Sequence, residues 1–353
     1  MARLAVYKYL AFMMLVATAL VTAFTLAGLI GGFFAPSEGN TALAMLVYVL
    51  PLLVLANAVL LVYWILRRKW IWCCMPVATM LLSLPYIGTF YRPGLFASQT
   101  KGKSSLIIAT YNVARFANEV SPFRSESILA EMRRQQVEIL CLQEYRDYSG
   151  DRSNTERYQQ FYPYKAVGAD DMVIFSRFPI LDSQTISFGE GTNNSAQWAE
   201  LNVRGRRLRI INVHLQTTGI SRSLRLAQKA NYQGQKVEGN KLLRMIYGNY
   251  TQGMAIRGEQ ADIVAGVRDE SQVPCILCGD FNDVPYSYVY RTLKGDMTDG
   301  FQECGTGYMY TFTGKKSVRI DYIFHDEQLN GLAYYKQNLS FSDHLPVYMK
   351  IGL

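Results

Sequence analysis

The first third of this 353-residue chain contains almost no acidic residue. Residues 1–103 hold eight lysines and arginines but one carboxylate side chain, Glu38, whereas the rest holds 28 basic and 27 acidic residues. Most of the net charge of +8 therefore lies in the first third. A domain that binds nucleic acid through its charge usually carries a basic footprint, and the near-neutral remainder shows none. The imbalance bears instead on membrane topology.

Cysteine and histidine are also scarce, with six and three residues respectively. No set of them has the spacing of a zinc site or of a disulfide framework. Cys275 and Cys278 have the CxxC spacing, but they end an apolar, strand-like run and do not open a helix. We therefore interpret them as packing residues and not as a redox pair. Among the cysteines, only Cys304 is expected to be accessible to solvent.

Three long stretches lack any charged residue, namely 9–34, 41–66 and 70–90. An apolar helix of about 20 residues crosses the hydrocarbon core of a bilayer, and each stretch reaches that length. The sequence therefore predicts three transmembrane helices within a membrane anchor of residues 1–91. A cleaved signal peptide is the alternative for the first stretch, but that stretch is long for a signal core and two more follow.

The segments that flank these stretches predict the orientation. Arg3 and Lys8 precede the first stretch, residues 67–69 (RRK) separate the second from the third, and the first loop carries only Glu38. Because cytoplasmic loops are enriched in Lys and Arg, the N-terminus and the second loop are expected in the cytoplasm. An odd number of spans then places the rest of the chain outside, in a multi-pass protein of the cell (inner) membrane.

After an expected linker at 92–105, the chain alternates β-prone apolar runs with polar segments. Residues 125–136 have helical spacing, and 198–203 and 207–213 are expected to form a hairpin turned at Gly205. The remaining strand-like runs are 106–112, 137–142, 172–175, 275–278, 319–324 and 347–351. This pattern alone favours an α/β or α+β fold rich in strands.

The stretch from Pro274 to Pro285, PCILCGDFNDVP, combines a buried strand with a polar end. Gly279 permits a sharp turn, and Asp280, Asn282 and Asp283 follow it at once. Oxygen-bearing side chains at the end of a buried strand suit a hard cation or an attacking water. An Asx-rich turn without any chemical role is the alternative interpretation.

Other apolar runs of the second part also have polar residues at their ends. Strand-end side chains from several strands can converge on one edge of a sheet, and their joint occurrence favours a catalytic site over separate structural roles. One acid also lies inside an apolar run, where a buried carboxylate needs a partner. The residues concerned are Asn112, Glu144, His214, Asp280, Asn282, Asp321, Asp343 and His344.

A long polar insert lies between His214 and Gln272. We expect one or two helices there, with Leu243, Met245 and Ile246 facing inward. Up to residue 257 it contains one acid, Glu238, and seven cations, namely Arg222, Arg225, Lys229, Lys236, Lys241, Arg244 and Arg257. These cations form either a solvated helical face or a cationic patch that steers anionic substrates or contacts anionic lipid head groups. For Arg257, together with Gln260, a place on an outer helix of the domain is a further alternative.

Six motifs occur in a recognisable order: TYNV (110–113), LQE (142–144), NVHL (212–215), GDFND (279–283), RIDY (319–322) and SDHLP (342–346). In this order they resemble the endonuclease/exonuclease/phosphatase superfamily over roughly residues 106–353. The resemblance implies a four-layered α/β (α+β) sandwich of two packed mixed β-sheets flanked by helices, here preceded by the three expected spans. The combination with an N-terminal anchor is similar to membrane-anchored bacterial members.

The resemblance implies metal-assisted hydrolysis of a phosphate ester. Glu144 resembles the main metal ligand, and Asn112 and Asp343 resemble further ligands. Oxygen-rich ligation favours Mg²⁺, with Mn²⁺ as the alternative. Asn112 is also expected to contact the phosphate.

The resemblance also assigns the catalytic side chains. Asp280 resembles the residue that orients or deprotonates the attacking water, and Asn282 resembles the residue that steers water and phosphate oxygen. His344 and His214 resemble the phosphate-contacting histidines, and Asp321 is expected to hold the ring of His344 through its other nitrogen.

Three functions remain open at this point. The first is a membrane-embedded Mg²⁺-dependent phosphodiesterase or phosphatase acting on lipid head groups or soluble phosphoesters. The second is a membrane-tethered nuclease acting on DNA or RNA through the same site. The third is a catalytically inactive binding module, which the intact motif set disfavours. The sequence indicates no protein partner.

Overall fold

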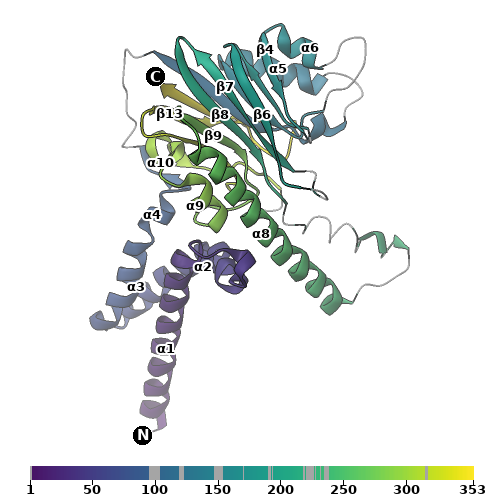
Figure 1. The fold of residues 1–353 in the computed structure, drawn as a ribbon. Helices are drawn as coiled ribbons and strands as arrows, with labels where there is room; N and C mark the ends of the chain where they lie inside the picture. The colour runs from purple at the N-terminus through teal and green to yellow at the C-terminus, as the bar shows by residue number, and fades with distance from the viewer. Residues whose placement is uncertain are drawn as a thin grey trace.

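The computed structural model of the protein describes residues 2–94, 104–118, 123–146, 154–169, 171–189, 194–217, 238–314 and 317–353 (Figure 1). It also describes short pieces at 192, 219, 226, 228–230 and 232–233. Of the expected linker at 92–105, residues 95–103 lie outside the described part. Tyr91–Arg92 form a short strand, β1, which pairs with β11 (Gly307–Tyr308) of the following domain.

Within the described residues, the strands of the second part form two six-stranded sheets packed face to face (Figure 1). The first has the order β13-β14-β2-β3-β5-β4 and the second the order β10-β12-β9-β8-β7-β6. The first sheet consists of β2 (Ser105–Asn112), β3 (Ile139–Gln143), β4 (Tyr164–Val167), β5 (Val173–Ser176), β13 (Asn330–Lys336) and β14 (Val347–Gly352). The second consists of β6 (Ile180–Ser187), β7 (Ser195–Val203), β8 (Arg206–His214), β9 (Cys275–Asp280), β10 (Thr298–Asp299) and β12 (Asp321–His325).

Helices cover the outer face of each sheet. Ala261 of α8 (Gly239–Asp269) and Leu293 of α9 (Tyr288–Lys294) pack on the second sheet, and Ile128 of α5 (Phe123–Arg134) packs on the first. The short helix α6 (Asn154–Gln159) adds Tyr158 to the layer on the first sheet, whereas α10 (Gly300–Cys304) packs Phe301 and Cys304 into the cluster between the sheets. A separate apolar cluster, which includes Ile108 and Ile276, fills the space between the sheets. The predicted four-layered sandwich of two mixed sheets is thereby confirmed.

One parallel strand pair in each sheet brings the predicted site residues together. In the first sheet β2 and β3 are parallel, with Asn112 opposite Gln143. In the second, β8 and β9 are parallel, with His214 opposite Asp280. The carboxyl ends of parallel strands share one edge of a sheet, which is where α/β folds bind ligands. The neighbouring strand β12 runs antiparallel to β9 and sets Asp321 directly opposite Asp280.

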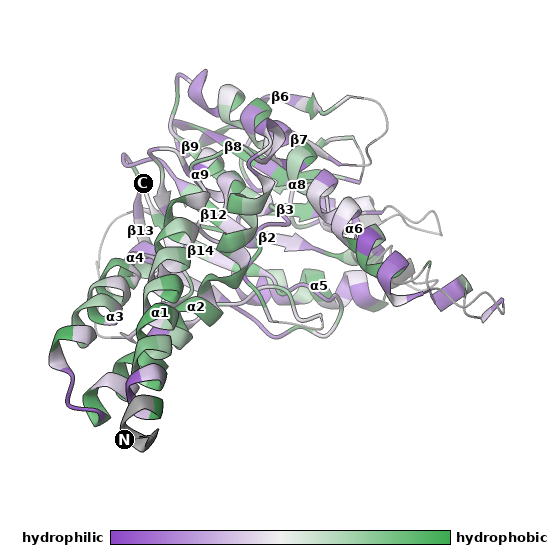
Figure 2. Cartoon of the chain, turned by 90° about the horizontal axis from the view of Figure 1, so that it is seen from below, coloured by the Kyte–Doolittle hydropathy of each residue, from purple (hydrophilic) through white to green (hydrophobic). Residues whose placement is uncertain are grey.

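The N-terminal part consists of apolar helices, green in Figure 2, that extend away from the sandwich. These are α1 (Ala2–Gly31), α2 (Thr41–Leu66), α3 (Trp70–Leu82) and α4 (Leu84–Ile87), with a 3-10 turn, η1 (Pro36–Glu38), between the first two. Among the described residues two helices are long and apolar enough to cross a membrane, at Val6–Gly31 and Thr41–Leu66.

The expectation of a third single helix over 70–90 is wrong. The helix α3 ends at Leu82, after about 20 Å at ~1.5 Å per residue. Pro85 has no N–H group and therefore cannot continue the series of backbone hydrogen bonds of α3. It lies at the start of the four-residue helix α4, where proline is tolerated.

The helix ends nearer the sandwich pack against it. Arg291 donates from Nη2 to the carbonyl oxygen of Leu29 at 3.0 Å. The rings of Tyr86 and Tyr286 meet edge to face, 5.4 Å between centroids. A Cβ at Gly32 would lie 1.9 Å from the carbonyl oxygen of Tyr286, so only glycine permits this approach. Because Tyr286 lies in the loop after β9, the apolar helices support the loop that follows Asp280.

A buried polar cluster joins the second turn of α2 to this loop. Arg257 of α8 is fully buried, and its Nε donates to Asp283 Oδ2 at 3.1 Å. Its Nη2 donates to Tyr48 Oη at 3.3 Å, and the Tyr48 hydroxyl donates to Asp283 Oδ1. Its Nη1 donates to the carbonyl oxygen of Gln216, two residues after His214, at 2.9 Å. One guanidinium thus connects α2, α8 and the loops after β8 and β9.

Several expectations about single side chains need correction. Arg257 belongs to neither a solvated face nor a cationic patch, because the fold buries it against Asp283. Leu243 was expected to face inward, but it is 65% exposed because the first half of α8 extends beyond the sheet that the second half covers. Cys304 is buried at the end of α10, and Cys74 on α3 is the exposed cysteine of the described residues.

We expect Asp283→Asn to destabilise the protein by about 3–5 kcal/mol, because it leaves a buried guanidinium without its counter-charge. The melting temperature of the full chain in detergent should fall clearly. Asp269→Asn is a matched control, since Asp269 pairs with Arg268 at 2.7 Å but its side chain is 66% exposed. That pair should contribute at most about 1 kcal/mol. Equal losses in the two variants would contradict the importance of the buried cluster.

Candidate active site

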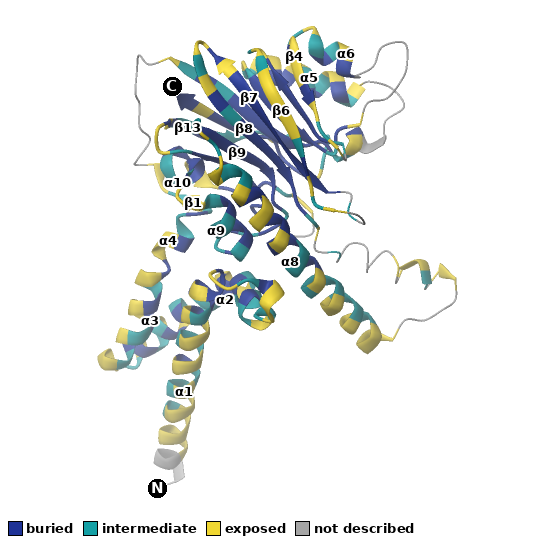
Figure 3. Ribbon diagram, viewed as in Figure 1, coloured by how far each residue is buried: buried dark blue, intermediate teal, exposed yellow. Residues whose placement is uncertain are grey.

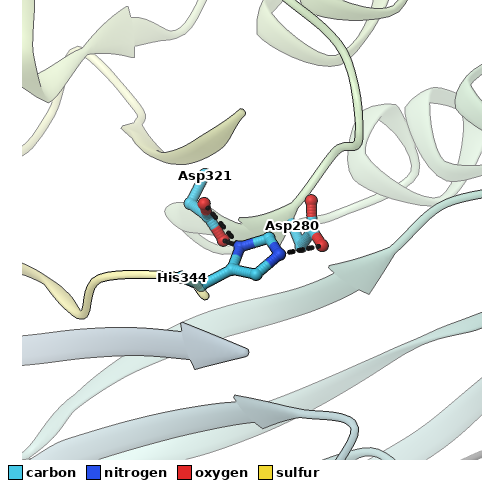
Figure 4. A group of neighbouring side chains, drawn as sticks. All are labelled: Asp280, Asp321 and His344. Atoms are coloured by element: carbon cyan, nitrogen blue, oxygen red, sulfur yellow. Dashed lines mark hydrogen bonds and ion pairs between the residues drawn. The ribbon is translucent and has the colours of Figure 1, made fainter. Parts of the chain in front are cut away.

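Asp280, Asp321 and His344 form the most enclosed part of the site (Figure 4). The possible ligand atoms of these three buried residues all lie within 4.8 Å of one another. His344 Nδ1 lies 3.1 and 3.0 Å from the two oxygens of Asp321, and its Nε2 lies 3.6 Å from Asp280 Oδ2. The ring of Phe312 packs edge-on against the imidazole, 5.1 Å between centroids. The ring is therefore fixed in position by Asp321 and Phe312.

The charges of this group favour an imidazolium. Burial alone would lower the pKa of His344, but the carboxylates of Asp321 and Asp280 outweigh that effect and raise the pKa to about 10. Burial raises the pKa of Asp280, and the negative charge of Asp321 adds to it, whereas the two histidines and Asn112 oppose it. A protonated imidazole has N–H donors on both nitrogens and no lone pair for a metal. His344 therefore suits contact with an anion better than ligation of a cation.

Asn112 connects this group to the second acidic position, Glu144. Its Nδ2 donates to Asp280 Oδ2 at 3.0 Å and to Glu144 Oε1 at 3.2 Å. Its Oδ1 accepts from the backbone N–H of Ala114 at 3.0 Å, which fixes the orientation of the amide. The side chain of Glu144 is one-third exposed, so its carboxylate remains open to solvent beside the buried residues.

His214 occupies the end of β8 with no hydrogen-bond partner among the described residues. Its side chain is 6% exposed, yet neither ring nitrogen has a partner there. Nε2 lies 3.8 Å from Glu144 Oε1 and 3.9 Å from Asp280 Oδ2. A buried polar group without a partner is costly, and such a group next to two carboxylates is typical of a site that a ligand completes.

Asn282 and Asp343 complete the comparison with the sequence prediction. Asn282 Nδ2 donates to Leu215 O at 2.9 Å and to Asp280 Oδ2 at 3.2 Å, so Asn282 is part of the cluster. The side chain of Asp343 is exposed, and its Oδ1 lies 3.5 Å from the hydroxyl of Ser342. Asp343 thus lies at the rim, one residue from His344.

Backbone conformations that L-residues rarely adopt gather around these side chains. Glu144 has φ +49° and Asn282 has φ +52°, although neither is glycine. Gly279 has φ +138°, and a Cβ there would lie 2.0 Å from the carbonyl oxygen of Val213 in the parallel strand. Strained backbone persists where the surrounding structure holds it, and it is frequent at active sites.

The sequence prediction did not include three residues that help to build the site, and one of them, Thr311, lies in no recognisable motif. Thr311 Oγ1 accepts from the backbone N–H of Asp321 at 3.0 Å and so fixes the start of β12. Gln143 Nε2 donates to Asn212 Oδ1 at 2.6 Å across the two sheets. Gln143 and Asn212 lie inside the LQE and NVHL motifs, so the motifs indicated them without indicating their role.

The donor set fits a divalent cation at Glu144, because a carboxylate open to solvent is a ligand type that hard cations prefer. The predicted ligand Asn112 turns its Nδ2 toward Glu144 and its Oδ1 toward the N–H of Ala114, so ligation by its amide oxygen would require the side chain to turn. The buried group of Asp280, Asp321 and His344 is already satisfied by its own hydrogen bonds and ion pairs. Among the four acids of the site, Glu144 and Asp343 keep their carboxylates accessible to solvent, whereas Asp280 and Asp321 are buried.

Comparison with known proteins agrees with this geometry. Residues 109–344 match the model of the Endonuclease/Exonuclease/phosphatase family. The chain belongs to this family. The match contains all eight predicted site residues, and the predicted enzyme class, a phosphoric ester hydrolase, is confirmed at the level of the family. Residues 11–90 match a domain of unknown function, DUF8431.

Curated relatives and solved structures are each similar to part of the chain. The chain is 27% identical over 220 residues to the CCR4-Not complex 3'-5'-exoribonuclease subunit Ccr4 of Aspergillus niger, covering 50% of this chain and 33% of that protein. The corresponding subunit of Emericella nidulans is 25% identical over 222 residues, covering 48% and 32%. The chain thus spans about a third of the length of these relatives.

Two bacterial structures show the fold. The endonuclease/exonuclease/phosphatase from Beutenbergia cavernae is 19% identical with a TM-score of 0.50, over 70% of this chain and 72% of that one. The protein from Bacteroides vulgatus is 17% identical with a TM-score of 0.50, over 71% and 100%.

We expect Asp321→Asn to lower the pKa of His344, because the neutral amide no longer stabilises the imidazolium. The raised pKa of about 10 keeps the ring charged at neutral pH in the wild type. Histidine NMR of the full chain should show this ring losing its proton at lower pH in the variant. The variant's turnover should fall by about 10–100-fold, as for other groups that orient a functional residue. An unchanged titration would contradict the role of Asp321.

Proposed function

We propose that the protein is a membrane-anchored, Mg²⁺-dependent phosphoester hydrolase that acts outside the cytoplasmic membrane, on lipid head groups in preference to soluble phosphoesters. One observation carries this proposal: Asp283, which contacts Tyr48 in the second turn of α2, lies three positions after Asp280 in the chain. Three residues span at most about 11 Å. If α2 crosses the bilayer, the reacting groups lie close to its surface.

The charges along the apolar helices support the orientation. Arg67 at the end of α2 lies 4.4 Å from the ring of Tyr7 near the start of α1, so both helix ends lie together, away from the sandwich. Arg67, Arg68 and Lys69 follow one another there, whereas the loop nearer the sandwich carries Glu38. The positive-inside rule then places the basic end in the cytoplasm and the sandwich outside.

The side chains of this site supply a base for the attacking water and groups that align it. Water attacks phosphorus, one P–O ester bond breaks, and the proton of the water passes to a base while the leaving oxygen gains a proton. Asp280, with its raised pKa, is the base and is aligned by Asn112 and Asn282.

The two histidines receive the anionic phosphate. His344, held as imidazolium by Asp321, donates its Nε2–H to a phosphate oxygen as negative charge develops. His214 faces the same space with unpaired ring nitrogens. A Mg²⁺ or Mn²⁺ ion would be held by Glu144, with Asp343 at the rim and Asn112 as a further ligand once its amide turned, and it would supply a Lewis acid that offsets the charge of the phosphate.

A membrane-tethered nuclease is the second candidate. It is favoured by the similarity of half of this chain to a 3'-5'-exoribonuclease subunit. The same site residues serve both reactions, so the substrate distinguishes the two candidates. The near-neutral charge of residues 104–353 favours the first.

The full chain in lipid nanodiscs should hydrolyse a chromogenic phosphodiester with Mg²⁺, lose this activity in EDTA and regain it when Mg²⁺ returns. Asp280→Ala and His344→Ala should each reduce turnover by about 10²–10⁴-fold while circular dichroism shows that the variants remain folded. The full chain is the appropriate enzyme, because without the N-terminal helices Tyr286 and Asp283 lose their packing partners.

The same preparation should then be offered phosphatidylcholine and phosphatidylglycerol vesicles, a polyadenylate oligonucleotide and plasmid DNA. Release of head groups with intact nucleic acids supports the first candidate. Cleavage of a nucleic acid alone selects the nuclease. Near-normal activity in Asp280→Ala or His344→Ala would refute the site.

A further inference from the structure

The first half of α8 extends beyond the sandwich, whereas the second half covers the outer sheet (Figure 1). We call residues 239–252 the α8 overhang. From Gly253 onward the helix has buried residues such as Met254 and Arg257, but within the overhang Leu243 is 65% and Tyr247 54% exposed (Figure 3). Large apolar side chains exposed on neighbouring turns of one helix often mark a contact surface.

These apolar side chains continue the face by which α8 packs. Leu243, Tyr247, Tyr250 and Met254 are spaced four, three and four residues apart, so they lie on one side of the helix. Tyr250 packs edge-on against Tyr48 of α2, 5.3 Å between ring centroids, and Met254 is buried. The exposed part therefore extends a face that already contacts an apolar helix of the N-terminal part.

The contact with Tyr48 indicates the depth at which the overhang lies relative to the bilayer. The ~30 Å hydrocarbon core corresponds to about 20 residues of helix. The basic residues 67–69 follow directly after Leu66, and the 20 residues that end at Leu66 begin next to Tyr48. Tyrosine is enriched at this boundary between lipid tails and head groups. In Figure 1 α8 descends away from the sandwich, to one side of α1 and α2, and its N-terminal end reaches about the height of the upper part of these helices.

The charged residues of the overhang also suit the boundary between lipid tails and head groups. Residues 239–252 contain Lys241 and Arg244 and no acidic residue, and both cations are exposed. A helix with apolar side chains on one face and cations elsewhere is the usual form of an interfacial helix on anionic lipids.

We propose that the α8 overhang lies in the head-group layer of an anionic bilayer and holds the entrance of the active site against the lipid surface. This inference rests on the proposed membrane anchoring. The second half of α8 connects the overhang to the site, because Gln260 Oε1 accepts a hydrogen bond from the backbone N–H of Gln216 at 2.8 Å. Gln216 lies two residues after His214. Contact of the overhang with lipid thus positions one wall of the site relative to the substrate.

Depth-dependent fluorescence tests the contact without any need for activity. The full chain is reconstituted in vesicles of phosphatidylcholine and phosphatidylglycerol, with or without bromine atoms on the acyl chains. The fluorescence that Tyr247→Trp adds to the wild type should be blue-shifted and largely quenched by the brominated lipid. Tyr164→Trp is the matched control, because Tyr164 is exposed on β4 at the far side of the sandwich, and its added fluorescence should not change. An unquenched, water-like spectrum of Tyr247→Trp overturns the proposal.

Hydrolysis by a charged variant tests the consequence for catalysis. Leu243→Glu combined with Tyr247→Glu should reduce head-group release from the vesicles by about tenfold or more, since lipid contact scales with the apolar area buried. Hydrolysis of the soluble chromogenic phosphodiester should remain at the wild-type rate. Leu181→Glu, at an exposed site on β6, should change neither rate. Equal head-group release by wild type and the double variant would overturn the proposed role.

These two measurements separate this inference from the proposed function. Absence of all hydrolysis, with Tyr247→Trp quenched, refutes the enzyme assignment and leaves the membrane contact established. Hydrolysis of the soluble ester with an unquenched Tyr247→Trp supports the enzyme and refutes the membrane contact of the overhang.

Discussion

The buried guanidinium of Arg257 is the constraint on which the arrangement of this protein depends. A charge without access to water must be compensated on every side, and here the partners come from separate parts of the chain. Asp283 follows β9, Gln216 follows β8, and Tyr48 belongs to α2. If any of the three moved away, the charge would be left incompletely satisfied. The loops that follow His214 and Asp280 are thereby held together and held against the N-terminal helices.

The catalytic chemistry depends on a comparable balance of charges. Two buried carboxylates, Asp280 and Asp321, lie opposite each other on paired strands, and His344 lies between them. The imidazolium lowers the repulsion between the two acids, and they in turn raise its pKa. Glu144 remains accessible at the edge of the same cluster, where a cation has room. In the proposed mechanism, the phosphate lies on the side of His344 and the cation on the side of Glu144.

Much of the fold and of the site was predictable from the sequence. Strand-end polar residues are local signals, and six motifs in order identified the family and its sandwich. Asn112, Glu144, His214, Asp280, Asn282, Asp321 and His344 are brought together as predicted, and Asp343 lies at the rim. Helix lengths were less predictable: hydropathy continues from Trp70 to Phe90, but the helix divides at Ser83 and Pro85. The environment of Arg257 and Leu243 was not predictable, because burial at these positions depends on which distant segment covers the helix.

The sequence by itself determined the order of the elements, the family, and the residue types that meet at the strand ends. These are properties of local pattern, since a buried strand followed by a carboxylate is visible in a few consecutive letters. Only the tertiary structure decided how near the reacting groups lie to the apolar helices. That proximity results from packing between segments more than 200 residues apart, such as Tyr48 and Asp283, and from the burial of one charge that links them. The same packing leaves the first half of α8 uncovered by protein, at the level where the bilayer surface is expected.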